Sequence, residues 1–198
     1  MRLKQIAVSI ALAACLPAAQ ADIVGGTNFV DISGSEPAVN PGFESTLAFG
    51  WNEATGVSLG SLLASVDTIT GALDGDTLIN SHMIGFDPEE RSAIEATVTF
   101  DSEILGVIWV TDSLSATDAL LGLPTITYLD NPPFYLGFES PFDMFSVSGN
   151  TLTFRAGANK PGDFLRVITA AVPEPSTYAM MGLGLFGVML AARRRRSA

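Results

Sequence analysis

One short segment of this chain has the residue types and spacing of a catalytic motif. Gly56-Val57-Ser58-Leu59-Gly60 matches the G-x-S-x-G pattern of a serine nucleophile. That pattern works where a strand turns sharply into a helix in a large α/β sheet, with an acid and then a histidine much later in the chain. The only histidine, His82, follows Ser58 by just 24 residues, and no parallel-sheet pattern surrounds them. We therefore expect no Ser58/His82 hydrolase, and we expect His82 to be a hydrogen-bonded or solvated side chain at a strand end.

Carboxylates are the abundant metal ligands. Asp74-Gly75-Asp76, with Asp67 nearby, offers oxygen atoms to calcium, but an EF-hand loop needs a glutamate six residues after its glycine, where Ser81 stands. The segment is therefore expected to be a solvated turn, and we predict no metal ligands and no cofactor, with calcium as the alternative. Paired acids for glycoside hydrolysis stay open, because the spatial separation of two carboxylates is not visible in a sequence.

Two other patterns have simpler explanations. Aromatic side chains that could stack on sugar rings are Trp51, Tyr128, Phe134, Tyr135 and Phe138. Phe134 and Tyr135 follow Asn131-Pro132-Pro133, which indicates a loop, yet core packing is the favoured role for the set.

Gly182-Leu183-Gly184-Leu185-Phe186-Gly187 has dinucleotide-site spacing but lies in an apolar terminal segment with no preceding strand, so helix packing explains it.

Strands must position any such residues. Residues 94–100 alternate between apolar and polar, and residues 104–111 are apolar on both faces, as in a covered central strand. Residues 145–148 and 151–154 flank Gly149-Asn150 and predict a hairpin, and residues 164–169 predict another strand.

Helical signals are short. Ser115 to Asp118 has capping-box spacing before a helix that Gly122 ends, and residues 61–66 predict a second short helix. This pattern predicts a mainly β fold, an antiparallel, jelly-roll-like β-sandwich. Its predicted core consists of Ile84, Phe86, Val98, Phe100, Ile104, Val107, Ile108, Leu120, Leu121, Leu152, Phe154, Leu165, Val167 and Ile168.

Charge excludes one class of partner. The 198 residues contain 21 acidic and 10 basic side chains, a net charge of −11. Residues 22–172 contain 20 acidic and 4 basic side chains, a net charge of −16. Such a surface repels phosphate, so we expect no nucleic-acid binding.

The N-terminal segment has the features of a secretory signal peptide. Basic residues at positions 2 and 4 precede an apolar run over residues 6–16. The small-x-small pattern Ala19-Gln20-Ala21 follows, which is typical of a signal-peptidase site, and we predict cleavage between Ala21 and Asp22. The alternative is a lipobox at Leu12-Ala13-Ala14-Cys15, with Cys15 lipidated. Because Cys15 is the only cysteine, cleavage before Asp22 leaves a chain without thiols or disulfides.

The C-terminal segment predicts a membrane anchor. Residues 177–192 carry no charge and are followed by the cluster Arg193, Arg194, Arg195 and Arg196. A helix of 16 residues is about 24 Å long, a marginal membrane span, and the arginines should stay on the cytoplasmic side. The segment before it, which we call the strip, comprises Val172, Pro173, Glu174, Pro175 and Ser176. Its two prolines cannot enter a helix, so the strip should be extended and exposed.

Pro173-Glu174-Pro175, the apolar helix and the arginine cluster, in that order at the C-terminus, closely resemble the PEP-CTERM sorting signal of exported proteins in Gram-negative bacteria. The resemblance implies recognition by an exosortase, a membrane-embedded cysteine-protease-like enzyme that removes the tail, in a cell that makes exopolysaccharide. The alternative is an ordinary single-pass anchor with a chance Pro-Glu-Pro. A second resemblance, to PEP-CTERM proteins of unassigned activity, covers residues 81–88, 104–108, 161–163 and 166–169 and brings no catalytic residues.

The chain is thus expected to comprise a signal peptide (1–21), an exported domain (22–171) and a sorting signal (172–198). We expect a non-enzymatic protein that crosses the inner membrane, is briefly anchored there and is processed to the cell surface or extracellular matrix. Its expected partners are signal peptidase, an exosortase and exopolysaccharide. One alternative is a secreted carbohydrate-active enzyme that uses paired carboxylates, and another is a calcium-stabilised matrix protein.

Overall fold

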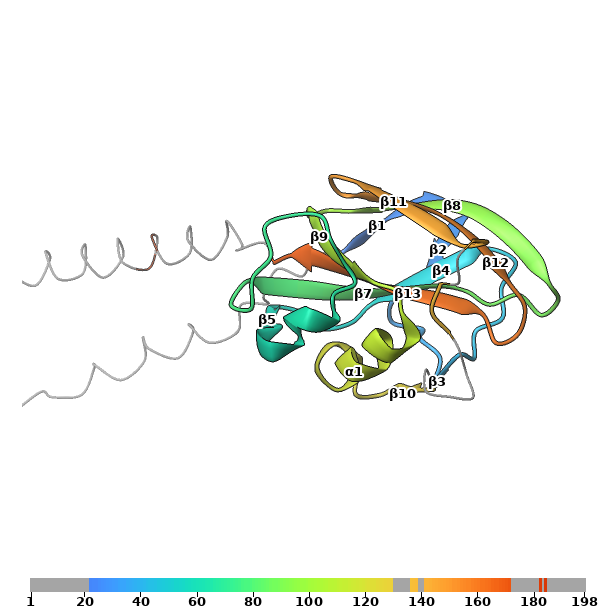
Figure 1. Cartoon of the computed structure of the whole chain (residues 1–198), viewed down its shortest axis with the longest axis horizontal. Helices are drawn as coiled ribbons and strands as arrows, with labels where there is room; N and C mark the ends of the chain where they lie inside the picture. Colours follow the sequence, from blue (N-terminus) through green and yellow to red (C-terminus); the bar gives the residue numbers. More distant parts are fainter. Residues whose placement is uncertain (1–21, 130–135, 139–140, 172–181, 183, 185–198) are drawn as a thin grey trace, which may run out of the picture. The chain divides into compact units, whose positions relative to one another are not determined.

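The computed structural model of the chain describes residues 22–129, 136–138, 141–171, 182 and 184. Its described residues from 22 to 171 belong to one compact unit, which is mainly β, as predicted. Two sheets are stacked, and two short helices cover the outer face of the larger sheet (Figure 1).

The smaller sheet has four antiparallel strands in the order β1 (Ile23–Thr27), β8 (Ser92–Phe100), β12 (Thr151–Ala158) and β11 (Met144–Ser148). The predicted alternation in β8 is confirmed, because Ala96, Val98 and Phe100 are buried while the residues between them are partly exposed. The predicted hairpin is also confirmed. Ser148 pairs with Thr151 across a two-residue turn, in which Gly149 has φ +60°.

The larger sheet has the order β2 (Phe29–Asp31), β4 (Ala48–Asn52), β7 (Leu78–Phe86), β13 (Asp163–Ala170), β9 (Ile104–Ile108) and β6 (Thr68–Ile69), and β5 (Val57–Ser58) pairs with β7. It is mixed rather than antiparallel throughout, because β2 runs parallel to β4. All five residues of β9 are buried, which confirms the prediction of a strand covered on both faces, although the strand ends at Ile108 instead of residue 111. A separate parallel pair joins β3 (Val39–Asn40) to β10 (Thr127–Tyr128).

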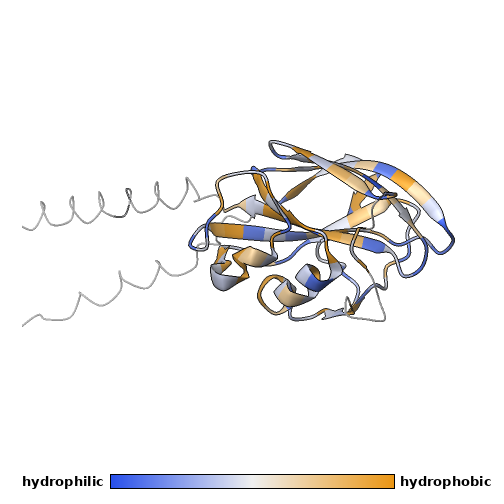
Figure 2. Ribbon diagram, in the orientation of Figure 1, coloured by the Kyte–Doolittle hydropathy of each residue, from blue (hydrophilic) through white to orange (hydrophobic). Residues whose placement is uncertain are grey.

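Two apolar clusters hold the layers together. One lies between the sheets and includes Phe100, Phe154 and Val167. The other lies on the opposite face of the larger sheet, beneath the helices, and includes Trp51, Ile108 and Leu121. Figure 2 shows apolar residues along the strands of both sheets and along both helices. Every predicted core residue is buried except Leu120, which is 36% exposed because the helix turns its side chain to solvent.

The helices correct one prediction. The 3₁₀ helix η1 (Gly60–Ser65) agrees with the predicted short helix, and Gly122 ends α1 (Thr111–Leu121) as expected. The capping box at Ser115 is wrong, because α1 begins at Thr111 with Val110 as its N-cap residue and no side-chain cap of its own. The start of α1 is instead held from another segment: Asp67 Oδ2 accepts hydrogen bonds from the backbone N–H groups of Trp109 (2.7 Å) and Val110 (2.9 Å), and Ser113 Oγ donates to Asp67 Oδ1 (2.7 Å).

Within the described part of the chain, no helix is both long and apolar enough to span a membrane. The predicted signal peptide and, apart from Gly182 and Gly184, the predicted membrane segment over residues 177–192 lie outside the described residues.

Candidate functional site

The residues predicted to be processed lie at the borders of the described chain. Ala19 and Ala21 of the signal-peptidase site, the strip over residues 172–176 and the arginine cluster over residues 193–196 are all outside the described residues. Asp22, on the mature side of the predicted cleavage, and Ala171, directly before the strip, are described. The geometry around these two residues is therefore the part of the processing region that the structure defines.

Both borders lie at the same end of the two stacked sheets. The turn between β8 and β9 contacts both: the N–H of Asp101 donates to the carbonyl of Asp22 (3.2 Å), and the N–H of Ala170 donates to the carbonyl of Glu103 (2.9 Å). The N–H of Ala171 continues this pairing by donating to Leu78 (3.2 Å). We call this region the junction end and define it as residues 22, 101–103, 170 and 171. The first residue of the sorting strip therefore follows directly from a hydrogen-bonded strand.

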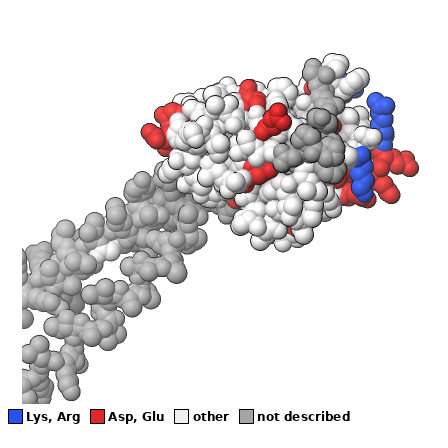
Figure 3. Space-filling view, turned by 60° about the horizontal axis from the view of Figure 1, so that its bottom comes forward, with Lys and Arg blue, Asp and Glu red and all other residues white. Residues whose placement is uncertain are grey.

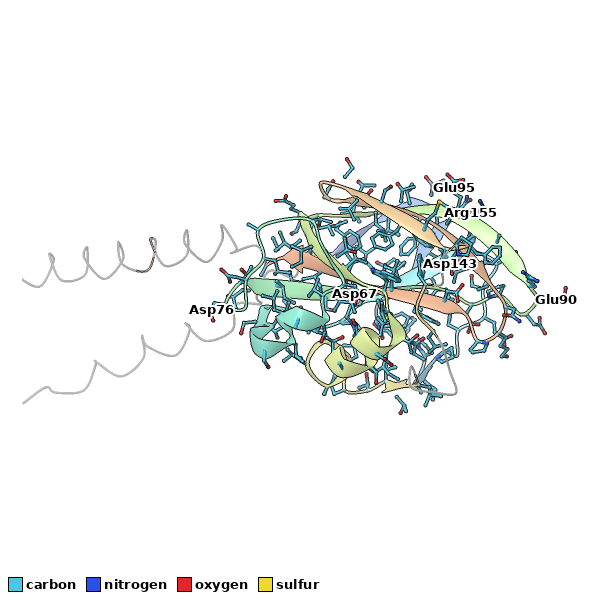
Figure 4. The ribbon with its side chains drawn as sticks, viewed as in Figure 1. Asp67, Asp76, Glu90, Glu95, Asp143 and Arg155 are labelled. Carbon is cyan, nitrogen blue, oxygen red and sulfur yellow. The ribbon has the colours of Figure 1, made fainter. Side chains whose placement is uncertain are left out.

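Charge is distributed unevenly between the two ends. The junction end carries the acidic side chains of Asp22, Asp101 and Glu103, and Asp76 lies near the start of β7 at the same end (Figure 4). Arg91 and Lys160 lie in the β7–β8 and β12–β13 turns at the opposite end. On the face shown in Figure 3, Lys and Arg gather at one end among Asp and Glu. The described basic side chains Arg91 and Lys160 thus lie at the end opposite the junction end, and acidic side chains, among them Glu89 and Glu90, accompany them there.

A chain of hydrogen-bonded polar side chains, buried at His82 and Thr169 and exposed at Asp22, connects the two borders. His82 lies in the middle of β7 and is fully buried, so its predicted position at a strand end is wrong, while the predicted hydrogen bonding is present. Its Nδ1 lies 2.7 Å from Asn52 Oδ1 and its Nε2 lies 2.9 Å from Thr169 Oγ1. Since a carbonyl oxygen only accepts, Nδ1 carries the proton and Nε2 accepts from Thr169. Burial lowers the pKa of His82 to about 3, so the ring is neutral at physiological pH.

Asn52 extends this chain to the beginning of β1. Its Nδ2 donates to Asp22 Oδ1 (3.1 Å), and its Oδ1 accepts from the N–H of Ile23 (3.3 Å). Thr169 is the penultimate residue of β13. Hydrogen bonds therefore run from the first described residue of the domain, through His82, to the strand that precedes the sorting strip.

A second buried cluster, around Arg166, fixes α1 to the larger sheet. The guanidinium of Arg166 bonds to Glu53 through Nε (2.6 Å) and Nη2 (3.1 Å), and Nη2 also donates to Asp118 (2.9 Å). Nη1 donates to Thr117 Oγ1 (2.7 Å) and to the carbonyl of Leu114 (3.2 Å). All five N–H groups of the guanidinium thus have acceptors.

Further contacts complete the surroundings of Glu53. Its two oxygens also accept from Tyr128 Oη (2.7 Å) and Ser81 Oγ (2.8 Å). Burial lowers the pKa of Arg166, but Glu53 and then Asp118 outweigh it, and the net shift is upward. Burial, followed by the charge of Glu53, raises the pKa of Tyr128. Every polar group of this cluster bonds within the protein, so the cluster serves structure and presents no open site. The sequence signal that points to such a cluster is a single arginine within the apolar run Phe164 to Ile168.

The structure does not bring the two candidate catalytic residues together. Ser58 is exposed on the short strand β5, where it pairs with Leu78, four residues before His82 on β7. Both ring nitrogens of His82 already bond to Asn52 and Thr169. No described contact joins Ser58 to an acid–histidine pair.

The candidate calcium ligands are used in local structure. Asp74 Oδ1 accepts from the hydroxyl of Thr77 (2.8 Å) and from the N–H groups of Thr77 (2.8 Å) and Asp76 (3.0 Å), which closes the turn before β7. These hydrogen bonds, first that from the Thr77 hydroxyl, lower the pKa of Asp74. Asp67 holds the start of α1. Within the described ranges, no three side chains of His, Cys, Asp or Glu gather as a metal ion would require.

Three of the candidate sugar-stacking residues, Trp51, Tyr128 and Phe138, are among the described residues, and none of these three is exposed. Trp51 is fully buried and Phe138 is 6% exposed, while Tyr128 is partly buried against Glu53 and Arg166. Core packing, the favoured interpretation, is confirmed for Trp51 and Phe138. Phe134 and Tyr135 lie outside the described residues.

One open hollow of about 290 Å³ lies on the smaller sheet, lined by residues of β11 and β12 and by Glu95 of β8. Its charged members are Glu95 and Arg155, which are cross-strand neighbours and are labelled in Figure 4. Glycoside hydrolysis needs two facing carboxylates. The lining of this hollow supplies one.

Comparison with known sequences gives one match. A family model described as the PEP-CTERM protein-sorting motif matches residues 171–196. No curated protein and no solved structure matches the chain. The match begins at the last described residue of the exported domain and covers the Pro-Glu-Pro strip, the apolar segment and the arginine cluster.

Proposed function

Because the tail is a PEP-CTERM protein-sorting motif, which marks an exosortase-targeted exported protein, we propose that this chain is a non-catalytic surface or matrix protein of a Gram-negative bacterium. Signal peptidase removes residues 1–21, the tail holds the domain in the inner membrane, and the exosortase then acts at the strip over residues 172–176. The observation that carries this proposal is the match over residues 171–196.

The polarity of the tail supports the order of events. Four consecutive arginines resist translocation and remain on the cytoplasmic side, so the chain before residue 177 lies outside. The apolar segment is short for a membrane about 30 Å thick, which suits a transient anchor. A domain delivered in this way stays next to the membrane until its tail is cut.

The position of the strip supports processing of a folded domain. Ala170 and Ala171 are hydrogen-bonded to Glu103 and Leu78, so the strip follows a fixed strand without an intervening linker. Two prolines around one residue keep the following backbone extended and unpaired, a form that a processing enzyme can bind. The exosortase would thus act on a segment that begins directly after Ala171 of the junction end.

A non-catalytic role is supported by what the candidate catalytic residues do. His82 joins the polar chain between the two borders, and the buried charged side chains Glu53 and Arg166 fix α1 to the larger sheet. Each of these groups serves the stability of the stacked sheets, which we interpret as a jelly-roll-like sandwich. A secreted carbohydrate-active enzyme with paired carboxylates remains the alternative.

Association with exopolysaccharide has support from the outer face of the smaller sheet. Strand register aligns Ser146, Thr153, Thr97 and Thr27 in one row across all four strands. The row lies beside the hollow that contains Arg155. Hydroxyl groups in a row can exchange hydrogen bonds with sugars. A glycan array probed with the secreted protein tests this role: neutral polysaccharides should bind the protein, and the absence of binding to any glycan would contradict the role.

The direct test of sorting replaces Pro173, Glu174 and Pro175 by alanine in the full chain. If the strip is the recognition element, the uncut protein should accumulate in the inner membrane. Glu89→Ala with Glu90→Ala is a matched control, since it removes exposed charges at the opposite end. Release of the triple-alanine protein at the wild-type level would contradict the proposal.

A further inference from the structure

The backbone nitrogen at the predicted signal-peptidase site is held against a carboxylate. The N–H of Asp22 donates to Asp101 Oδ1 at 3.0 Å, and the carbonyl of Asp22 accepts from the N–H of Asp101 at 3.2 Å. Asn52 holds the same residue from the other side through Asp22 Oδ1. The nitrogen that cleavage would release therefore already has a defined place in the fold.

We propose that removal of the signal peptide creates an ion pair between the new α-ammonium group of Asp22 and the carboxylate of Asp101, and that this pair locks the start of β1. The inference rests on the proposed function, because it requires cleavage between Ala21 and Asp22. In that hydrolysis the peptide bond breaks, water supplies hydroxyl to the carbonyl carbon of Ala21 and hydrogen to the nitrogen of Asp22, and the amine takes up a further proton at neutral pH. A neutral amide donor becomes a cation in the same position.

The electrostatics of the junction end favour a cation at this nitrogen. The pKa of Asp22 is raised, first by partial burial and then by the negative charges of Asp101 and Asp31. Three carboxylates thus repel one another around the start of β1. The ammonium group adds one positive charge among them and reduces this repulsion.

The sign of the pH dependence follows from the same groups. The ammonium faces Asp101, the carboxylate of Asp22 itself and, more remotely, Asp31, so its pKa in the folded protein should lie above the usual value of about 7.7–8.0. Its contribution to stability is then complete below that value and is lost as the pH rises through the higher, folded-state pKa. The site is exposed, so the expected effect is modest.

The pair would also make the fold sensitive to the choice of cleavage site. Cleavage at the lipobox before Cys15 leaves residues 15–21 attached, and the nitrogen of Asp22 stays an uncharged amide. Ile23, the next residue, is buried in the cluster between the sheets, and its N–H is bonded to Asn52. Fixing Asp22 therefore stabilises the start of β1, where Ile23 enters the core and Asn52 bonds to both Asp22 and His82.

The test compares the chain from Asp22 to Ala198, purified in detergent with a free α-amino group, with a chain that begins two residues earlier at Gln20. At pH 7 the form that begins at Asp22 should melt about 2 °C higher. The difference should vanish in Asp101→Asn, which keeps an acceptor oxygen but removes the charge, and above about pH 10. Glu103→Gln is the matched control, since it removes a neighbouring charge and should preserve the difference.

One kind of result would contradict the ion pair itself, and another would contradict the cleavage that the ion pair requires. Equal melting temperatures for the two forms, or a difference that persists in Asp101→Asn, would show that no such ion pair forms. N-terminal sequencing of the exported protein tests the premise separately, and a start at Cys15 or Met1 rather than Asp22 would show that maturation does not create the pair.

Discussion

Acidification should destabilise this protein through its single histidine. His82 is buried in the middle of β7, bonded to Asn52 and Thr169, with its pKa lowered by burial to about 3. The unfolded chain has a histidine pKa of about 6.5, so it binds more protons than the folded protein between these two values. The stabilising contribution is therefore complete above about pH 6.5 and is lost progressively as the pH falls towards 3.

The magnitude follows from the pKa shift. Each unit of pH in this window changes the free energy of unfolding by up to about 1.4 kcal/mol. When the pH is lowered from 7.5 to 4.5, about the last two of these pH units lie below the histidine pKa of the unfolded chain. The free energy of unfolding should therefore fall by about 2.5 kcal/mol. That loss is a large part of the stability of an ordinary domain.

The assay is urea unfolding of the mature chain at a series of pH values, followed by the fluorescence of Trp51 and Trp109. The matched control is His82→Gln, which keeps an amide donor and acceptor but does not titrate. Asp22 and Asp87, whose pKa values are raised mainly by burial, give a pH dependence of opposite sign in both proteins, so the difference between them isolates His82. Identical pH profiles for wild type and His82→Gln would refute a buried, neutral histidine.

Two further predictions concern the Arg166 cluster and the membrane tail. Arg166→Met should lower the free energy of unfolding by about 3–5 kcal/mol, because it leaves Glu53 buried without its cation. Urea unfolding measures this loss, and the double variant with Glu53→Gln should recover part of it. Additive effects of the two substitutions would argue against coupling between the two residues. Deleting Arg193 to Arg196 should let the tail pass through the membrane, so the protein should leave the membrane fraction without processing; normal retention, measured by fractionation, would argue against their stop-transfer role.

Local patterns predicted a large part of the fold. The hairpin around Gly149 depends on two strands and a turn that are adjacent in sequence, and the alternation in β8 depends on one face of one strand. Such signals need no information about distant segments. The continuous apolar run in β9 likewise indicated cover on both faces, although the sequence did not show that η1 and α1 provide the outer cover.

The errors came from partners far away in the sequence. The N-cap residue of α1 was placed five residues too late, at Ser115 instead of Val110, because the group that holds the start of the helix, Asp67, is more than 40 residues earlier. His82 was expected at a strand end, hydrogen-bonded or solvated, whereas it lies in the middle of β7, where Asn52 and Thr169 bond to its ring in the interior. The Arg166 cluster was missed for the same reason, since its members come from three strands, a helix and the residue that follows β4.

The processing region combines features that are local in the sequence with one that depends on distant segments. The order of the strip, the apolar segment and the arginines is local, and the match to the PEP-CTERM protein-sorting motif confirms its recognition from sequence. The contact of both Asp22 and the end of β13 with the turn between β8 and β9 depends on strand order, and only the structure reveals it.

The intact mass of the protein recovered from the culture medium and cell surface tests the account most directly. In cells with an active exosortase, the mass should correspond to a chain that begins at Asp22 and lacks the apolar segment and arginines, and in cells without the enzyme the tail should remain attached. A chain that keeps residues 1–21 and stays in the cytoplasm, or one with the same C-terminus in both cell types, would contradict the account.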